Sequence, residues 1–186
     1  TIGSYWLVAG QLDEAVRWLR KSVSVDPGNP RQIASLGWVF LNLGDLDRAE
    51  YWIERSIELA PESFLPNLVM QLLHLYRGED VRALDYGRKA FAAWPSIWPG
   101  LALLRDHGLR KRRYAEARAL YEKAYPELLN EDDPKVVGRN WREATDLALV
   151  LTKTGEQERA NRLLESGFRY IQTMPRRSPP YVARRS

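Results

Sequence analysis

Residues 29–61 read NPRQIASLGWVFLNLGDLDRAEYWIERSIELAP, and this stretch decides the fold. It opens with an asparagine–proline pair, which suits the N-cap and the first position of a helix. Gly44 interrupts the stretch, and a helix can end there because glycine tolerates positive φ. Pro61 closes it. Apolar and small residues on both sides of Gly44 recur every three or four positions, which predicts two helices joined by a turn.

The same punctuation recurs along the chain at a fixed step of about 34 residues. The residues that share this step are Pro27, Pro61 and Pro95; Gly10, Gly44 and Gly78; Ala15, Ala49 and Ala83; and Gly3 and Gly37. Four registers with one period indicate a repeat protein. Each repeat is expected to be a pair of antiparallel helices, in which small side chains allow close packing.

This spacing resembles the tetratricopeptide repeat, a helix–turn–helix of about 34 residues. The second repeat fills the family pattern most completely, with Leu36-Gly37, Phe40, Gly44, Ala49, Ile53, Ser56 and Pro61. The third repeat departs from it by carrying Met70-Gln71 where the family has leucine and glycine. The resemblance implies an all-α fold, a right-handed solenoid of about five such repeats.

The second half of the chain is less regular than the first. Arg112 replaces the turn glycine of the fourth repeat, and the closing proline moves to Pro126. A fifth repeat, recognisable from Trp141, is displaced by nine extra residues near 130–140. We therefore expect one array over 1–175, with repeats at about 1–29, 30–63, 64–97, 98–131 and 141–174, followed by a Pro/Arg-rich tail at 176–186.

The inserted residues include the acidic stretch Asn130-Glu-Asp-Asp-Pro134. The stretch lacks the spaced ligands and the turn glycine of a calcium-binding loop, so we do not expect a metal site. Asp133 and Pro134 suit an N-cap and a first helical position. The sequence therefore predicts that a long helix starts here and runs to about Thr154.

Composition argues against several classes of function. With no cysteine, the chain forms no disulfide, thiolate nucleophile or zinc–thiolate site. Its two histidines, His74 and His107, fall in different repeats with no nucleophile or metal-ligand partner in the sequence. We therefore expect neither an enzyme nor a cofactor-binding protein. The lack of cysteine fits the reducing cytoplasm, where we place the protein, and also fits a bacterial periplasm.

Nucleic acid and membranes are not expected partners. The basic cluster at 110–113 lies in a predicted turn, and the net charge of +4 is modest for 186 residues. No nucleic-acid-binding motif accompanies the cluster. No stretch has the length of a membrane-spanning helix without a charge or a helix breaker.

The tetratricopeptide resemblance implies an inner groove lined by exposed positions of each repeat's first helix. The corresponding residues are Leu7; Arg31, Ala34, Trp38 and Leu41; Leu65, Leu68, Leu72 and Leu75; and Ala102, Asp106 and Leu109. Trp38, Leu68 and Leu72 stand where a chaperone-tail clamp of this family carries cationic or amide side chains, which argues against such a clamp. A largely apolar groove suits a helical or extended peptide segment of a protein partner.

The predicted helix at 64–76 has almost no polar face. A helix that is apolar all round must be covered on more than one side. We assign Leu36, Phe40, Met70, Leu104 and Leu147 to the core. For Leu68 and its neighbours, the alternatives are burial in the core and a surface for partner binding or self-association, of which we favour the surface.

A regulatory domain is a further alternative. The run 144–155 is similar to repeat regions that follow effector domains in bacterial signalling and transcription-regulator proteins. The chain also starts inside the first helix of a repeat, which predicts a piece of a larger bacterial protein. On this interpretation the repeats would sense a protein partner.

Overall fold

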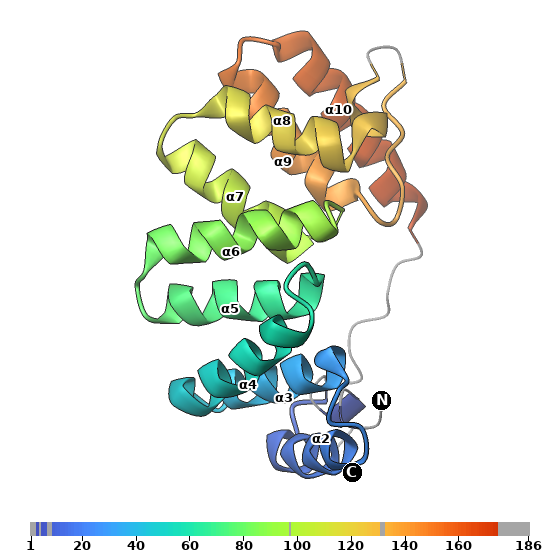
Figure 1. Ribbon diagram of the computed structural model, residues 1–186. Helices are drawn as coiled ribbons and strands as arrows, with labels where there is room; N and C mark the ends of the chain where they lie inside the picture. The colour runs from blue at the N-terminus through green and yellow to red at the C-terminus, as the bar shows by residue number, and fades with distance from the viewer. Residues whose placement is uncertain (1–2, 4, 7–8, 97, 131–132, 175–186) are drawn as a thin grey trace, which may run out of the picture. The chain divides into compact units, whose positions relative to one another are not determined.

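A computed structural model describes residues 3, 5–6, 9–96, 98–130 and 133–174 (Figure 1). All regular elements in this part of the chain are helical: α2 (Leu12–Val25), α3 (Pro30–Asn42), α4 (Leu46–Leu59), α5 (Phe64–Tyr76), α6 (Asp80–Ala93), α7 (Trp98–Arg110), α8 (Tyr114–Ala124), the 3-10 helix η1 (Pro126–Leu129), α9 (Trp141–Lys153) and α10 (Gln157–Thr173). The predicted all-α class, a solenoid of helix pairs, is confirmed. The predicted tail at 176–186 lies outside the described residues.

The chain divides into two compact units, residues 1–107 and 108–186. The boundary falls inside α7, close to its C-terminal end. None of the helices in the described ranges is both long enough and apolar enough to cross a membrane.

The core of the first unit is built by the apolar stripes of α2 to α5. Leu36 and Phe40 of α3 are buried there with Met70 of α5, as the sequence predicts. Close packing at α3 requires glycine, because a Cβ on Gly37 would lie 2.6 Å from Ile53 Cγ1. The side chain of Asn29 caps α3 by accepting a hydrogen bond from the Gln32 N–H at 3.3 Å.

The turns inside the helix pairs share one backbone geometry. Gly10, Gly44, Gly78 and Gly155 have φ values of 75°, 77°, 74° and 86°. Arg112 occupies the same position between α7 and α8 with φ 57°, the only positive value among described residues other than glycine. The Arg113 N–H donates to the Gly108 carbonyl at 2.7 Å. This bond belongs to a Schellman-type helix end, which favours glycine at the left-handed position.

Replacing Arg112 by glycine is expected to stabilise the second unit by about 0.5 to 1 kcal/mol. The substitution removes the steric cost of a left-handed conformation and keeps the turn. Chemical denaturation followed by circular dichroism measures the change. Arg113→Gly is the control, because Arg113 has a negative φ of −90° and should gain nothing. A lower stability for Arg112→Gly would contradict the expectation.

The predicted long helix starting at Asp133 and Pro134 is wrong, because α9 begins at Trp141. The preceding segment is held in a non-helical conformation by side chains. Ser166 Oγ of α10 donates to the Pro134 carbonyl at 2.9 Å, and Asn140 Oδ1 accepts from the Val137 N–H at 2.8 Å. Contacts with α10 therefore override a local helix-start pattern.

A contact between two buried residues, Tyr125 and Glu143, joins the helices on either side of this segment. Burial, together with the negative charges of Glu143 and Glu127, raises the pKa of Tyr125 to about 12. The phenol therefore stays protonated at neutral pH and donates a hydrogen bond to Glu143. This contact joins the end of α8 to the first turn of α9.

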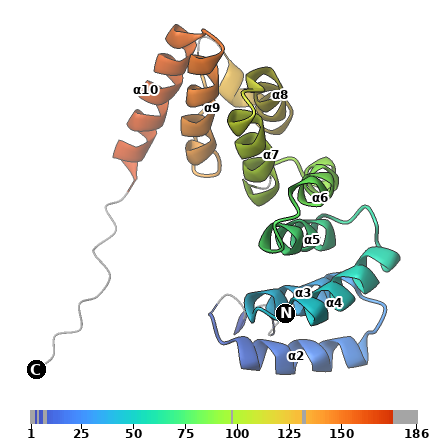
Figure 2. The ribbon, with the colours of Figure 1, turned by 90° about the vertical axis from the view of Figure 1, so that its left-hand side faces the viewer.

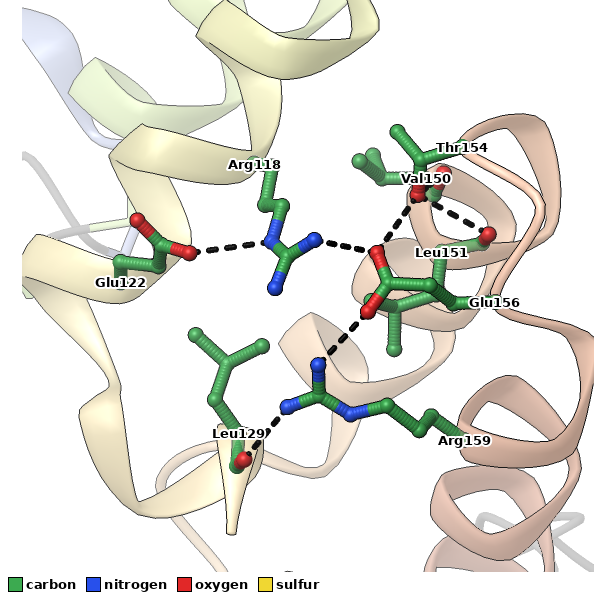
Figure 3. A network of polar contacts seen from close by, with 8 residues as sticks. All are labelled: Arg118, Glu122, Leu129, Val150, Leu151, Thr154, Glu156 and Arg159. Carbon is green, nitrogen blue, oxygen red and sulfur yellow. Dashed lines mark hydrogen bonds and ion pairs between the residues drawn. The ribbon is translucent and has the colours of Figure 1, made fainter. Parts of the chain in front are cut away.

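Glu156, at the start of α10, joins three elements of the second unit (Figure 3). One carboxylate oxygen accepts from Arg118 of α8 and, at 3.0 Å, from Thr154 Oγ1. The other oxygen accepts from Arg159 at 2.6 Å, and Arg159 also donates to the Leu129 carbonyl at 2.8 Å. Burial alone would raise the pKa of Glu156, but the hydrogen bonds from Thr154 and Arg159 and the two guanidinium charges hold it below its usual value.

This lowered pKa makes the second unit sensitive to acid. Because the folded state favours the ionised carboxylate, its contribution is present above the unfolded pKa, near 4.5, and is lost as pH falls through the lower folded pKa. Glu156→Gln should cost about 1 to 2 kcal/mol at neutral pH. That difference should shrink below pH ~4. Denaturation curves across this range measure it, and a difference independent of pH would contradict the assignment.

Candidate partner-binding face

The residues predicted to line the groove fall into three groups of exposure. Arg31 and Asp106 are exposed, and Trp38, Leu65, Leu72, Leu75 and Leu109 are half-buried. Four are buried, namely Ala34, Leu41, Leu68 and Ala102. Leu7 lies outside the described residues, and Leu109 belongs to the second unit.

The buried group corrects the prediction that all of these positions are exposed. Leu41 is 4% exposed and joins the same buried cluster as Val69 and Leu73 of α5. Leu68 is 2% exposed, so it contributes to the core and cannot itself mediate self-association. The physical reason is that α3 and α5 pack against each other, which covers positions that would be exposed on a single helix pair.

Four of the predicted residues that are not buried occupy corresponding positions on α3 and α5. Arg31 of α3 corresponds to Leu65 of α5, and Trp38 corresponds to Leu72, because the members of each pair are one repeat apart. Trp38, Leu65 and Leu72 pack partly against the core and remain partly open to solvent. We call these four residues, together with Asn42 and Tyr76, the α3–α5 face.

Asn42 and Tyr76 are the members of this face that the sequence prediction missed. Asn42 is exposed, and Tyr76 is 70% exposed. They follow Trp38 and Leu72 by four residues, which places them on the same side of their helices. They are also one repeat apart, so the repeat register could have identified them.

An ion pair fixes the position of α5 beside α4. The two terminal guanidinium nitrogens of Arg77, at the end of α5, donate to the two Glu50 carboxylate oxygens of α4 at 2.8 Å. The hydrogen bond from Arg77 lowers the pKa of Glu50, against the opposing effect of burial. A bidentate pair restrains orientation as well as distance. It therefore restrains the α5 part of the α3–α5 face against α4.

Away from this face, α5 also buries three polar side chains, those of Asn67, Gln71 and His74. Asn67 Nδ2 donates to the Pro61 and Ser63 carbonyls at 2.7 Å. His74 Nδ1 lies 2.8 Å from Glu79 Oε2, and its ring stacks on Tyr86 of α6. The amide of Gln71 has no hydrogen-bond partner within the described structure. The sequence marks Gln71 as a departure from the family pattern and His74 as a histidine without a catalytic partner, whereas Asn67 was not noticed.

Comparisons with known proteins identify the repeats. A family model described as a tetratricopeptide repeat matches residues 33–63, and another with the same description matches residues 4–21. A search of curated proteins finds no match to the sequence.

Several solved structures share the fold at low sequence identity. The crystal structure of MamA has a TM-score of 0.62 and 16% identity, covering 92% of this chain and 95% of that chain. PilF of Pseudomonas aeruginosa has a TM-score of 0.69 and 18% identity, covering 90% and 72%. The APC/C hetero-tetramer Cut9–Hcn1 has a TM-score of 0.62 and 20% identity, covering 93% and 33%. These similarities support the fold.

Proposed function

Because the chain belongs to the tetratricopeptide-repeat family, we propose that it is a protein-interaction scaffold whose α3–α5 face binds a helical or extended peptide segment. The role is non-catalytic. The observation that supports it is the half-buried pair Trp38 and Leu72, two large apolar side chains in matched positions on adjacent helices.

The chemistry of the face defines the peptide that would bind it. Trp38 and Leu72 offer an apolar centre, and aromatic residues contribute strongly to binding interfaces. Arg31 is exposed and forms no ion pair within the described residues. Asn42 and Tyr76 supply polar groups at the other end. A fitting segment carries apolar side chains at helical or extended spacing and an acidic residue near Arg31.

A peptide display library presented to the intact chain tests this proposal. Enriched sequences should combine aromatic or leucine residues with an acidic residue. The double variant Trp38→Ala with Leu72→Glu should lose their binding while its helical circular dichroism stays unchanged. The matched control is Tyr51→Ala with Val81→Glu, two exposed positions on α4 and α6. Peptides that bind the Trp38/Leu72 variant as well as the unaltered chain would refute this site.

A further inference from the structure

The connection between α7 and α8 concentrates positive charge. α7 ends at Arg110 and α8 begins at Tyr114, so residues 111–113 alone join the two helices (Figure 2). The connection lies within the second compact unit. Its consecutive cations are all exposed, namely Arg110, Lys111, Arg112 and Arg113. We call these four residues the basic cluster.

The acidic groups of the chain leave most of this charge unbalanced. Arg113 pairs with Glu116, in the first turn of α8, at 3.6 Å. Asp106, one turn before Arg110, pairs with Arg105 instead, at 2.7 Å. The other three side chains of the basic cluster form no hydrogen bond or ion pair with any described residue. Three positive charges therefore remain unbalanced, which is most of the net charge of +4 of the whole chain.

Arg112 brings one of these charges to a position that favours glycine. The other turns of this kind in the described ranges have glycine there, with positive φ. Arg112 adopts the same left-handed conformation, with φ 57°, at a steric cost that glycine avoids. Glycine would hold the turn more favourably, so the fold itself does not require a positive charge here.

Arg113 brings a second charge to a position where a carboxylate would stabilise the helix. The residue directly before the second helix of a repeat is acidic at Asp45, Glu79 and Glu156. Acidic groups are favoured there because the N-terminal end of a helix carries a partial positive charge. Two local preferences are thus set aside in one turn, each time in favour of a cation. Such departures are typical of functional sites.

Three classes of partner carry anionic groups that could neutralise the basic cluster. A lipid surface holds a few cations only marginally unless an apolar anchor assists, and no large apolar side chain is exposed at residues 108–116. Single-stranded nucleic acid is bound with aromatic stacking, and duplexes with a longer basic surface. A run of carboxylates on a protein needs neither feature, and tetratricopeptide repeats are protein-interaction scaffolds.

We propose that the basic cluster is a docking site for an acidic segment of a protein partner, with at least three consecutive aspartate or glutamate residues. A run of this length offers one carboxylate to each unbalanced cation. Exposed ion pairs contribute little energy individually, so the site selects and steers an acidic partner more than it retains one. It is separate from the α3–α5 face, which belongs to the first unit.

A titration followed by NMR tests the proposal, because NMR detects weak binding. The probe is a short peptide with four consecutive glutamates, added to the isotope-labelled intact chain, and a peptide with glutamines in their place is its control. The amide signals of residues 110–116 should shift and saturate with the glutamate peptide only. Added salt should weaken this binding, because exposed charges are screened.

Arg112→Gly separates binding from stability, because it removes a charge and eases the backbone at the same residue. Combined with Lys111→Gln, it should raise the dissociation constant of the glutamate peptide about fivefold to tenfold, since two exposed ion pairs are lost. The melting temperature should not fall. Arg17→Gln with Arg20→Gln is the matched control, because it removes two exposed cations from α2 and should leave binding unchanged.

Three results would overturn the proposal. The first is an equal response to the glutamate and glutamine peptides, and the second is binding that Lys111→Gln with Arg112→Gly does not weaken. The third is a response of the same amides to phosphatidylserine vesicles or to an RNA duplex at a lower concentration of anionic groups, which would assign the cluster to lipid or nucleic acid. Trp38→Ala with Leu72→Glu should leave glutamate-peptide binding at residues 110–116 intact, so failure of the α3–α5 proposal is distinguishable from failure of this one.

Discussion

Replacing Gly87 of α6 by leucine is expected to lower the free energy of unfolding by about 3 kcal/mol. Gly87 faces Gln71 of α5, and even a single Cβ at position 87 would lie 3.3 Å from the Gln71 side-chain carbon. Three further carbon atoms must then displace a fully buried amide. Because the interior is close-packed, the displacement strains α5 against α6.

The first two repeats show why a second substitution should rescue this one. In the second repeat, Gly37 of the first helix faces Ile53 of the second helix, and Gly3 faces Leu19 in the same manner. The third repeat exchanges the two sizes, with Gln71 in the first helix and Gly87 in the second. Gln71→Gly combined with Gly87→Leu restores the arrangement of the other repeats.

A double-mutant cycle measures the coupling. Gln71→Gly alone should destabilise by about 1 to 2 kcal/mol, because it opens a cavity and places a second glycine in the helix pair. The double variant should be more stable than the sum of the single changes by about 2 kcal/mol. Gly87→Ala is the control and should leave the free energy of unfolding nearly unchanged, because its gain in helix propensity offsets mild crowding. Additive effects would show that the two side chains do not share one space.

The size exchange also marks the limit of prediction from sequence. The repeat period alone predicted the helix pairs, the turn glycines and the core residues Leu36 and Phe40 of α3. It also flagged Gln71 as an exception. The compensation at Gly87 was hidden, because it depends on which residue of α6 faces Gln71. That relation comes from packing and not from the spacing of residues along the chain.

The candidate binding face was predicted in part. The first-helix positions lie on α3 and α5, where Arg31 is exposed and Trp38 and Leu72 are half-buried, and their role in binding stays a prediction. The buried members, such as Leu41, could not be recognised from one repeat, because the neighbouring repeat covers them. Asn42 and Tyr76 were missed although they share the repeat register. Burial between repeats is a tertiary property, and a pattern within one repeat does not report it.

The start of α9 was mispredicted for a different reason. Asp133 and Pro134 form a helix-start pattern, and local preferences of this kind are weak compared with tertiary contacts. Pro134 is buried, and its carbonyl accepts from Ser166 of α10. The side chain that organises the rest of the segment is Asn140, six residues further on. Nothing in its sequence context distinguishes it from a surface asparagine.

Asn140→Ala is therefore expected to destabilise the second unit by about 2 to 4 kcal/mol. The Asn140 side chain is fully buried and donates at 3.1 Å to both Glu127 Oε1 and the Lys135 carbonyl. It also accepts from the Val137 N–H at 2.8 Å. Alanine removes all three bonds and leaves buried polar groups without partners. Denaturation measures the loss, and hydrogen exchange at the Val137 amide should accelerate.

Two further variants separate the role of the amide from a general effect of substitution. Arg139→Ala, next in sequence, removes an exposed contact to Glu127 and should cost no more than about 0.5 kcal/mol. Asn140→Asp keeps the acceptor for Val137 but replaces the donor with a carboxylate facing Glu127. Its defect should be largest at neutral pH and should shrink in acid, where protonation of one carboxyl removes the repulsion and restores a donor. An Asn140→Ala variant as stable as the unaltered chain would mean that α10, through Ser166, is sufficient to hold the segment.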